Sequence, residues 1–321
     1  MKKILTVAIA CACLTGFSAC NDFLEEKPKS SLTAPDYYQT EAQAQANVNY
    51  LYRTGASSKL TGAGSAYVGP FASITGQLTG YFTNSYEGQE LTCKYSRELT
   101  RQQNTMTVSV TIDGIWDDCY KAINVANGAI KYIPEISMDQ SLANRLIGEA
   151  KFFRAWNYFN LVKIFGGVPL TVEYESMENM YLERASVEQV YAQVESDLKD
   201  AVNALPAATF YNNSNRITKY AAAMVLTSVY MQQGKYADAA SAVKTVIDSP
   251  HALATNDDLA LGSAYNKIRT TDGLAESILM STTQRSVTVV GGLLMRSTQR
   301  LQLYLVRILS LSVHTGQRIN S

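Results

Sequence analysis

Apolar residues recur at helical spacing along much of the chain, and the clearest case is the segment 141–165. Two neighbouring stripes of apolar side chains run along it, with members three or four residues apart. They consist of Leu142, Leu146 and Ala150 on one side and Phe152, Ala155, Phe159 and Val162 on the other. Gly166, Gly167 and Pro169 follow and end the pattern. We therefore predict a central core helix that is buried over much of its circumference.

The same spacing predicts five more helices, and helix-breaking residues mark several of their ends. They cover residues 36–53, 115–133, 186–205, 220–233 and 236–247. Pro134 ends the helix at 115–133 or the turn that follows it, and Pro206 ends the helix at 186–205. Ser186, with Gln189 three residues later, resembles a capping box at the start of the third. The short turn at 233–235 joins the last two helices into a hairpin.

Two helix pairs resemble tetratricopeptide-like hairpins, which repeat about every 34 residues and carry small residues where helices approach closely. The pair at 220–247 is the better match, with Ala239 and Ala242 in its second helix, and the pair formed by 116–133 and 141–165 is the weaker one. Such hairpins build a core or offer a docking surface. We therefore expect a mainly α fold of tetratricopeptide-like helical hairpins with a long aromatic-bearing loop region.

The segment between Thr54 and Asp113 differs from the rest because it is rich in glycine and aromatic residues and has little periodicity. Long loops on a rigid scaffold often carry binding sites. Sugars bind flat aromatic faces flanked by polar groups that pair their hydroxyls. The candidate ligand-binding residues are Tyr67, Tyr81, Phe82 and Tyr86, with Asn84 and Gln89 as hydroxyl partners. The alternative for each ring is that it packs the loop onto the helices.

The N-terminus has the pattern of a secretory signal peptide. Lys2 and Lys3 precede an apolar stretch, and Ser18 and Ala19 stand directly before Cys20, as in a bacterial lipobox. We expect residues 1–19 to be removed and Cys20 to be acylated, which would anchor the protein to a membrane. Residues 20–35 would then form the tether. The alternative is that another enzyme cuts nearby and Cys20 remains an ordinary thiol.

The composition is that of an ordinary globular protein, with 46% hydrophobic and 17% charged residues and no formal net charge. No mature stretch up to about residue 285 concentrates Lys and Arg, so nucleic acid is not an expected partner. Two of the five cysteines leave with the signal peptide and Cys20 takes lipid. The remaining pair, Cys93 and Cys119, forms either a disulfide or two buried thiols.

The sequence carries no recognisable catalytic constellation. His251 and His314 are the only histidines, and the motifs of serine hydrolases, dithiol redox proteins and P-loop enzymes are absent. The adjacent carboxylates at 117–118 and 25–26 are explained by solvated charge. We therefore predict a protein that is not an enzyme and needs neither cofactor nor metal. A glycosidase is the enzymatic alternative, since its two carboxylates need no sequence motif, and a helical docking protein without a glycan site is the other.

Four stretches resemble the SusD/RagB family of outer-membrane nutrient-binding lipoproteins. They are residues 20–28, 122–127, 148–170 and 216–236, and the third, with its aromatic helix followed by Gly-Gly-Val-Pro-Leu, is the most specific. The resemblance implies a surface-exposed lipoprotein, anchored by its lipid in the cell outer membrane. It also implies a partner, a SusC-like TonB-dependent transporter, and a ligand that is an oligosaccharide, such as a piece of starch, or another nutrient.

The chain departs from the family near its C-terminus. The likeness stops near Ser281, and residues 286–321 contain no Asp or Glu. We interpret residues 36–285 as the N-terminal part of a SusD-like helical domain and residues 286–321 as an aberrant tail produced by a frameshift. The alternative is a genuine amphipathic tail, since Leu303, Val306, Leu309 and Val313 lie three and four residues apart.

Overall fold

The computed structural model describes residues 37–54, 112–174 and 182–256, together with short stretches between residues 263 and 294. Every element below lies in the compact unit that begins at Thr40. The elements are α4 (Glu41–Thr54), α7 (Ile112–Tyr132), η3 (Ile133–Glu135), α8 (Gln140–Phe165), α9 (Val187–Ala204), η4 (Tyr211–Asn213), α10 (Lys219–Gln232), α11 (Tyr236–Ile247), β1 (Val289–Val290) and β2 (Leu293–Leu294). The predicted mainly α fold is confirmed.

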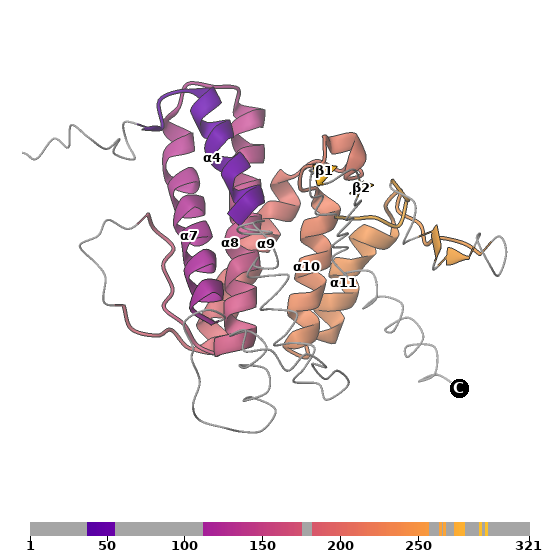
Figure 1. Cartoon of the computed structure of the whole chain (residues 1–321). Helices are drawn as coiled ribbons and strands as arrows, with labels where there is room; N and C mark the ends of the chain where they lie inside the picture. Colours follow the sequence, from indigo (N-terminus) through magenta and orange to yellow (C-terminus); the bar gives the residue numbers. More distant parts are fainter. Residues whose placement is uncertain are drawn as a thin grey trace, which may run out of the picture. The chain divides into compact units, whose positions relative to one another are not determined.

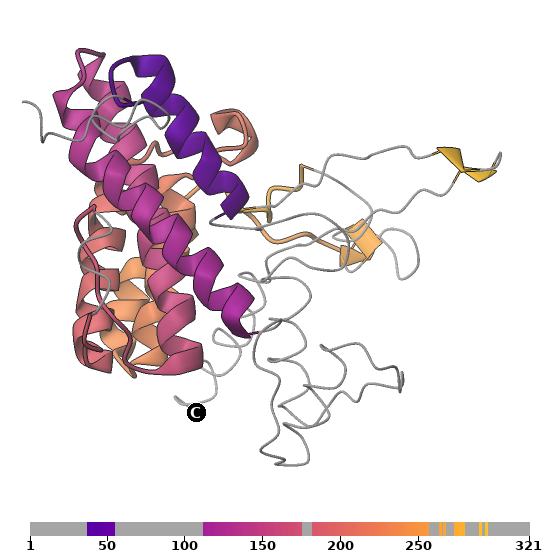
Figure 2. The same ribbon diagram turned by 60° about the vertical axis from the view of Figure 1, so that its left-hand side comes forward.

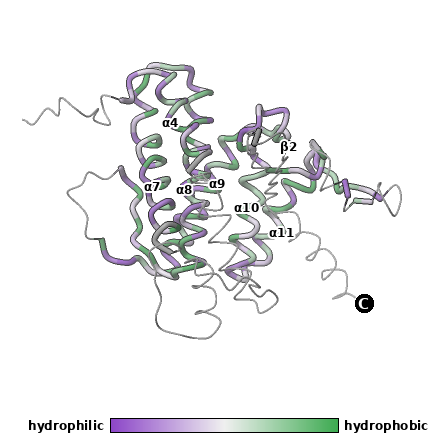
Figure 3. The backbone as a smooth tube through the Cα atoms, in the orientation of Figure 1, coloured by the Kyte–Doolittle hydropathy of each residue, from purple (hydrophilic) through white to green (hydrophobic). Residues whose placement is uncertain are grey.

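The helices from α7 to α11 form an antiparallel array in which each packs beside the next (Figures 1 and 2). Ion pairs fix the register of α8 against α9, because Lys151 pairs with Asp200 while Arg154, one turn later, pairs with Asp197. α4 packs against α7 and α8. Along α7, hydrophobic and hydrophilic positions alternate (Figure 3), as expected for a helix with one buried face.

The predicted central helix is α8, and its two ends have clear local causes. The Asp139 side chain accepts a hydrogen bond from the Leu142 amide and caps the N-terminus. Gly166 ends the helix with φ +73°, a conformation that glycine adopts without steric cost. Both predicted stripes of α8 are buried except at Leu142, so the prediction of a central core helix is confirmed.

α8 and α9 approach each other closely at Gly148. A Cβ atom built on Gly148 would lie 2.8 Å from the Cβ of Ala204, which is too short for two carbon atoms. At the other end of α9, Ser186 and Gln189 form the predicted capping box, with both side-chain to backbone hydrogen bonds present. These features fix where α9 begins and how near it lies to α8.

The hairpin of α10 and α11 is confirmed as predicted. Gly234 adopts φ +71° in the turn, and the Lys235 amide donates to the Tyr230 carbonyl to close it. α10 is almost entirely buried, with every residue from 220 to 227 in the core. α11 buries only Ala239 and Val246, so the two helices differ sharply in how much of their surface is covered.

The start of the first predicted helix was wrong. The prediction began near Asp36, whereas α4 begins at Glu41. The reason is local: the hydroxyl of Thr40 accepts a hydrogen bond from the Gln43 amide and serves as the cap. Ala44, Val48 and Leu51 form its buried face.

The structure also corrects the interpretation of residues 117–118 as solvated charge. Asp117 is exposed, but Asp118 is only 8% exposed. One residue later, Cys119 is buried, and Cys93 lies outside the described residues. The choice between a disulfide and two buried thiols for this pair stays a prediction.

Two further observations concern the chain as a whole. Within the described residues, no helix is long and apolar enough to span a membrane. β1 and β2 pair antiparallel in a two-stranded hairpin inside the predicted aberrant tail, while the proposed amphipathic stripe from Leu303 to Val313 lies outside the described residues. The division into signal peptide, tether, domain and tail stays a prediction.

Candidate functional site

The predicted ligand-binding loop joins α4 to α7, and the structure describes both of these helices. The candidate residues Tyr67, Tyr81, Phe82, Asn84, Tyr86 and Gln89 lie outside the described residues, as does Cys20. Their assignment therefore stays a prediction. What the structure does define is the scaffold from which the loop starts at Thr54 and to which it returns at Ile112.

An aromatic cluster lies at the end of this scaffold where the loop returns. The Trp116 ring contacts Tyr120 one turn further along α7, at 4.9 Å between ring centroids. It also meets Phe165, the last residue of α8, edge to face at 5.1 Å. These contacts join the first turns of α7 to the last turn of α8 through packed aromatic rings.

From this end of α8 the chain folds back over α7 and α8 before α9 begins. We call residues 166–174 and 182–186 the strap. Its two legs pair through an antiparallel bridge between Pro169 and Arg184, and the Ala185 amide donates to the Val168 carbonyl at 3.0 Å. Arg184 also donates to the carbonyls of Gly167 and Phe165, at 2.6 and 2.7 Å. Arg184 thereby supplies hydrogen-bond donors to carbonyl groups at the C-terminal end of α8, which have no partner within the helix.

Two tyrosines, the half-buried Tyr120 and the fully buried Tyr158, fasten the first leg of the strap to the helices. The Tyr120 hydroxyl donates to the Pro169 carbonyl at 2.7 Å. The Tyr158 hydroxyl donates to the Thr171 carbonyl at 2.8 Å and accepts from the Thr171 amide at 2.7 Å. Burial raises the pKa of both hydroxyls above the usual value, so both remain neutral and keep donating.

Beneath the strap lies a buried ion pair with an amide partner, which we call the Arg154 cluster. Arg154 forms a bidentate pair with Asp197, at 2.7 and 2.6 Å, and donates to the side-chain oxygen of Asn127 at 2.9 Å. None of the three residues is more than 5% exposed. The cluster therefore joins α7, α8 and α9 through charge-assisted hydrogen bonds.

The Arg154 cluster also holds the strap from below. Arg154 donates to the Val172 carbonyl at 2.9 Å, and the Asn127 amide donates to the carbonyls of Thr171 and Glu173 at 3.1 and 2.9 Å. Three consecutive strap carbonyls thus have buried donors. The strap is a structured surface whose backbone conformation depends on the helices below it.

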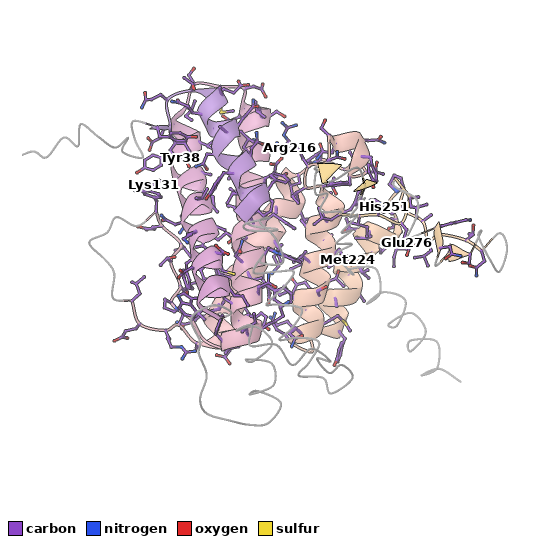
Figure 4. All side chains as sticks on the ribbon, in the orientation of Figure 1. Tyr38, Lys131, Arg216, Met224, His251 and Glu276 are labelled. Atoms are coloured by element: carbon purple, nitrogen blue, oxygen red, sulfur yellow. The ribbon has the colours of Figure 1, made fainter. Side chains whose placement is uncertain are left out.

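A second ion pair joins α8 to Arg216, which precedes α10 (Figure 4). Glu149 of α8 is fully buried and accepts two hydrogen bonds from Arg216. Arg216 also reaches α4, where it donates to Asn49 at 2.6 Å and lies over the Tyr52 ring at 5.0 Å. Burial, and then the negative charge of Glu149, raises the pKa of Tyr52. Its hydroxyl accepts from the Ile217 amide at 2.9 Å. This contact fixes the helix from which the aromatic loop departs.

A third cluster lies at the turn between α10 and α11. Glu195 of α9 accepts hydrogen bonds from Gln233 and Lys235. Burial disfavours the charged form of Glu195, but these hydrogen bonds and the charge of Lys235 outweigh it and hold the pKa of the carboxyl below its usual range. The cluster ties the hairpin turn to α9.

Several buried or half-buried polar groups of the described residues link separate segments of the chain. The carboxylates of Glu149, Asp197 and Glu195 are each occupied by a basic side chain. The Nδ1–H of His251 donates to the Ala275 carbonyl at 2.7 Å, and the nearby Glu276 accepts from the Ala254 amide (Figure 4). In the part of the chain that the structure describes, no group of three or more potential ligand residues is arranged to hold a metal.

Sequence reasoning did not find the Arg154 cluster, although a signal for it was present. Arg154 stands between Phe153 and Ala155 in the helix predicted to be buried over much of its circumference, where a charged residue needs a partner. In the structure, that partner is Asp197 on the buried side of α9. The position of Arg154 among predicted core residues would have indicated a buried ion pair, although not which residue completes it.

Comparison with known proteins agrees with this architecture. The profile of the SusD-like family described as "Starch-binding associating with outer membrane" matches residues 22–231, well over half of the 321 residues. This chain belongs to the SusD-like family, which confirms the resemblance seen in the sequence. SusD-like protein P2 of Formosa agariphila is 27% identical over 256 residues, covering 78% of this chain and 47% of that protein.

Solved structures show the same fold. A SusD-like protein from Bacteroides fragilis matches with a TM-score of 0.62 and 23% identity, covering 78% of this chain and 46% of that one. A laminarin binding SusD-like protein matches with a TM-score of 0.59 and 24% identity, covering 75% of this chain and 51% of that one. The chain thus spans about half the length of the relatives it matches.

Proposed function

We propose that this protein is an outer-membrane lipoprotein that captures glycans or other nutrients and passes them to a SusC-like TonB-dependent transporter. The observation that carries the proposal is the family match over residues 22–231. One structural neighbour is described as laminarin binding, which supports a carbohydrate ligand. The transporter partner and the surface-exposed lipid anchor are inferred from the resemblance to the family.

The described scaffold suits a capture protein better than a catalyst. Its buried carboxylates Asp197 and Glu149 are engaged in ion pairs, and its aromatic cluster joins the start of α7, to which the tyrosine-rich segment returns, to the end of α8. Shallow sites built from ring stacking and exposed hydrogen bonds give affinities on the order of micromolar to millimolar. Weak, reversible binding is what a protein that hands its ligand on requires.

The aromatic loop provides the test of glycan capture. We expect the mature chain from residue 21 to be retarded in affinity electrophoresis by at least one polysaccharide of a broad panel, with a dissociation constant in that range by calorimetry. Replacing Tyr81, Phe82 or Tyr86 with Ala should weaken binding roughly two- to tenfold, since stacking of one ring contributes about 0.5–1.5 kcal/mol.

Tyr236→Ala is the matched control, because Tyr236 is an exposed tyrosine far along the chain from the loop. It should leave retardation unchanged. Release of reducing ends during incubation would favour the glycosidase instead. If no polysaccharide of the panel retards the protein, and circular dichroism shows that it is folded, a helical docking lipoprotein without a glycan site would be favoured.

The anchor is tested separately. Cys20→Ala, expressed from the full precursor in a related bacterium, is expected to move the protein from the membrane fraction to the soluble fraction, because acyl chains contribute about 0.8 kcal/mol for each buried methylene. Immunoblots of the two fractions measure the shift, and Cys119→Ala, at a buried cysteine, is the control that should stay in the membrane. Retention of Cys20→Ala would show that something other than lipid holds the protein there.

A further inference from the structure

Two arginines converge on one buried carboxylate beside α4. Arg216, labelled in Figure 4, donates to both oxygens of Glu149. Arg145 stands one turn before Glu149 on α8, and its Nε lies 4.0 Å from Oε1, the oxygen that also accepts from the Nε of Arg216. Among the described residues, Glu149 is the only carboxylate that pairs with either arginine. Two guanidinium groups thus share one negative charge, and we call these three residues the arginine site.

The Nε–H of Arg145 is a buried donor that no acceptor matches. Within the described part of the chain it has no hydrogen-bond partner. Its separation from Glu149 is too long for a hydrogen bond, and both oxygens of that carboxylate already accept from Arg216. A buried donor without an acceptor is unfavourable, and more so on a charged group. An anionic oxygen from outside the chain would satisfy it.

Both guanidinium groups can be reached from solvent, whereas the carboxylate between them cannot. The side chains of Arg145 and Arg216 are 37% and 21% exposed, and that of Glu149 is fully buried. Arg216 donates twice to Glu149 and once to Asn49, which leaves further N–H groups of its guanidinium for another acceptor. A molecule approaching this site therefore meets donors and positive charge.

The guanidinium of Arg216 is held in place by groups on two helices. It pairs with Glu149 of α8, donates to Asn49 of α4 at 2.6 Å and lies over the Tyr52 ring at 5.0 Å. A side chain that is already fixed loses little conformational freedom when a ligand binds. The arginine site is thus preorganised, unlike an arginine on a freely solvated surface.

We propose that Arg145 and Arg216 bind an anionic group of the captured ligand, namely the carboxylate or sulfate group of an acidic glycan. The N–H fork of a guanidinium matches the paired oxygens of such groups. Their negative charge would also balance the second arginine, which Glu149 alone does not. The hydroxyls of a neutral sugar carry no charge and would not do so. This inference rests on the proposed capture of glycans and adds the class of glycan.

Polysaccharides that differ in charge test the proposal by affinity electrophoresis. Polygalacturonate with its methyl ester tests the carboxylate, and dextran sulfate with dextran tests the sulfate. At least one charged polymer should retard the mature chain more than its neutral counterpart does. Arg145→Gln should weaken that binding about tenfold, because it removes a charge-assisted contact. The variant should keep the melting temperature within about 2 °C, since a half-exposed ion pair at 4.0 Å contributes little.

Lys244→Gln is the matched control, because it removes the same charge from a lysine of α11 whose side chain is 72% exposed. It should leave retardation by the charged polymer unchanged. Equal weakening by Lys244→Gln and Arg145→Gln would overturn the proposal, because it would reduce the effect to general electrostatic attraction. Equal retardation by the charged and neutral members of both pairs would overturn it as well.

Inorganic phosphate separates the arginine site from glycan capture. The parent chain should broaden the phosphorus NMR signal of phosphate, and Arg145→Gln should not. This result without binding of any polysaccharide would support the anion site and refute its assignment to a glycan. Binding of neutral polysaccharides, with no effect of Arg145→Gln on either phosphate or the charged polymers, would leave glycan capture standing and refute the anion site.

Discussion

Arg154→Met is expected to lower the free energy of unfolding by about 3–5 kcal/mol, because it removes the partner of a buried carboxylate. Asp197 is 1% exposed and would keep only the hydrogen bond from Gln193, at 3.1 Å. The substitution would also remove the donor to the Val172 carbonyl. Urea unfolding of the mature chain, followed by circular dichroism, measures the change.

The matched control is the ion pair one turn away between the same two helices. Lys151 and Asp200 lie at 2.6 Å but are 24% and 51% exposed, so Lys151→Met should change stability by no more than about 1 kcal/mol. Combining Arg154→Met with Asp197→Leu should recover part of the loss, because no unpaired charge remains. Equal effects of Lys151→Met and Arg154→Met would contradict the account of a buried cluster.

The helices of this protein could be predicted because their signals are local. The capping box of Ser186 with Gln189 and the stop at Gly166 each depend on residues within one turn of the helix end. The burial of α8 followed from the apolar stripes in its own sequence. The start of α4 was misplaced because Thr40 competes with several other residues that can begin a helix, and periodicity alone does not choose between them.

The Arg154 cluster could not be predicted in the same way, because it depends on the register between helices. Arg154 and Asp197 are 43 residues apart, and they meet only because α8 and α9 are antiparallel and close at Gly148. The burial of Asp118 is also set by neighbouring helices rather than by its own position beside Asp117. In the aromatic loop, periodicity is weak, so the sequence indicates a kind of ligand without fixing which rings would touch it.

Gly167→Ala is expected to separate the two legs of the strap. A Cβ atom on Gly167 would lie 2.4 Å from the carbonyl oxygen of Ala185, and backbone atoms cannot turn away as a flexible side chain would. The Ala185 amide would then lose its hydrogen bond to Val168, and Arg184 its contact with the Gly167 carbonyl. We expect a loss of about 2–3 kcal/mol in the free energy of unfolding.

Amide hydrogen exchange distinguishes this effect from a general loss of stability. Gly167→Ala should accelerate exchange at Ala185 more than in the core of α10, because the strap opens while the helices stay packed. Gly234→Ala is the control: it has φ +71° and no atom within 4 Å of the new Cβ, so it should lower stability by about 1–2 kcal/mol through backbone strain alone. In that variant Ala185 should remain as protected as in the parent chain. If Gly167→Ala left exchange at Ala185 unchanged, the close approach at Gly167 would not be what keeps the two legs of the strap paired.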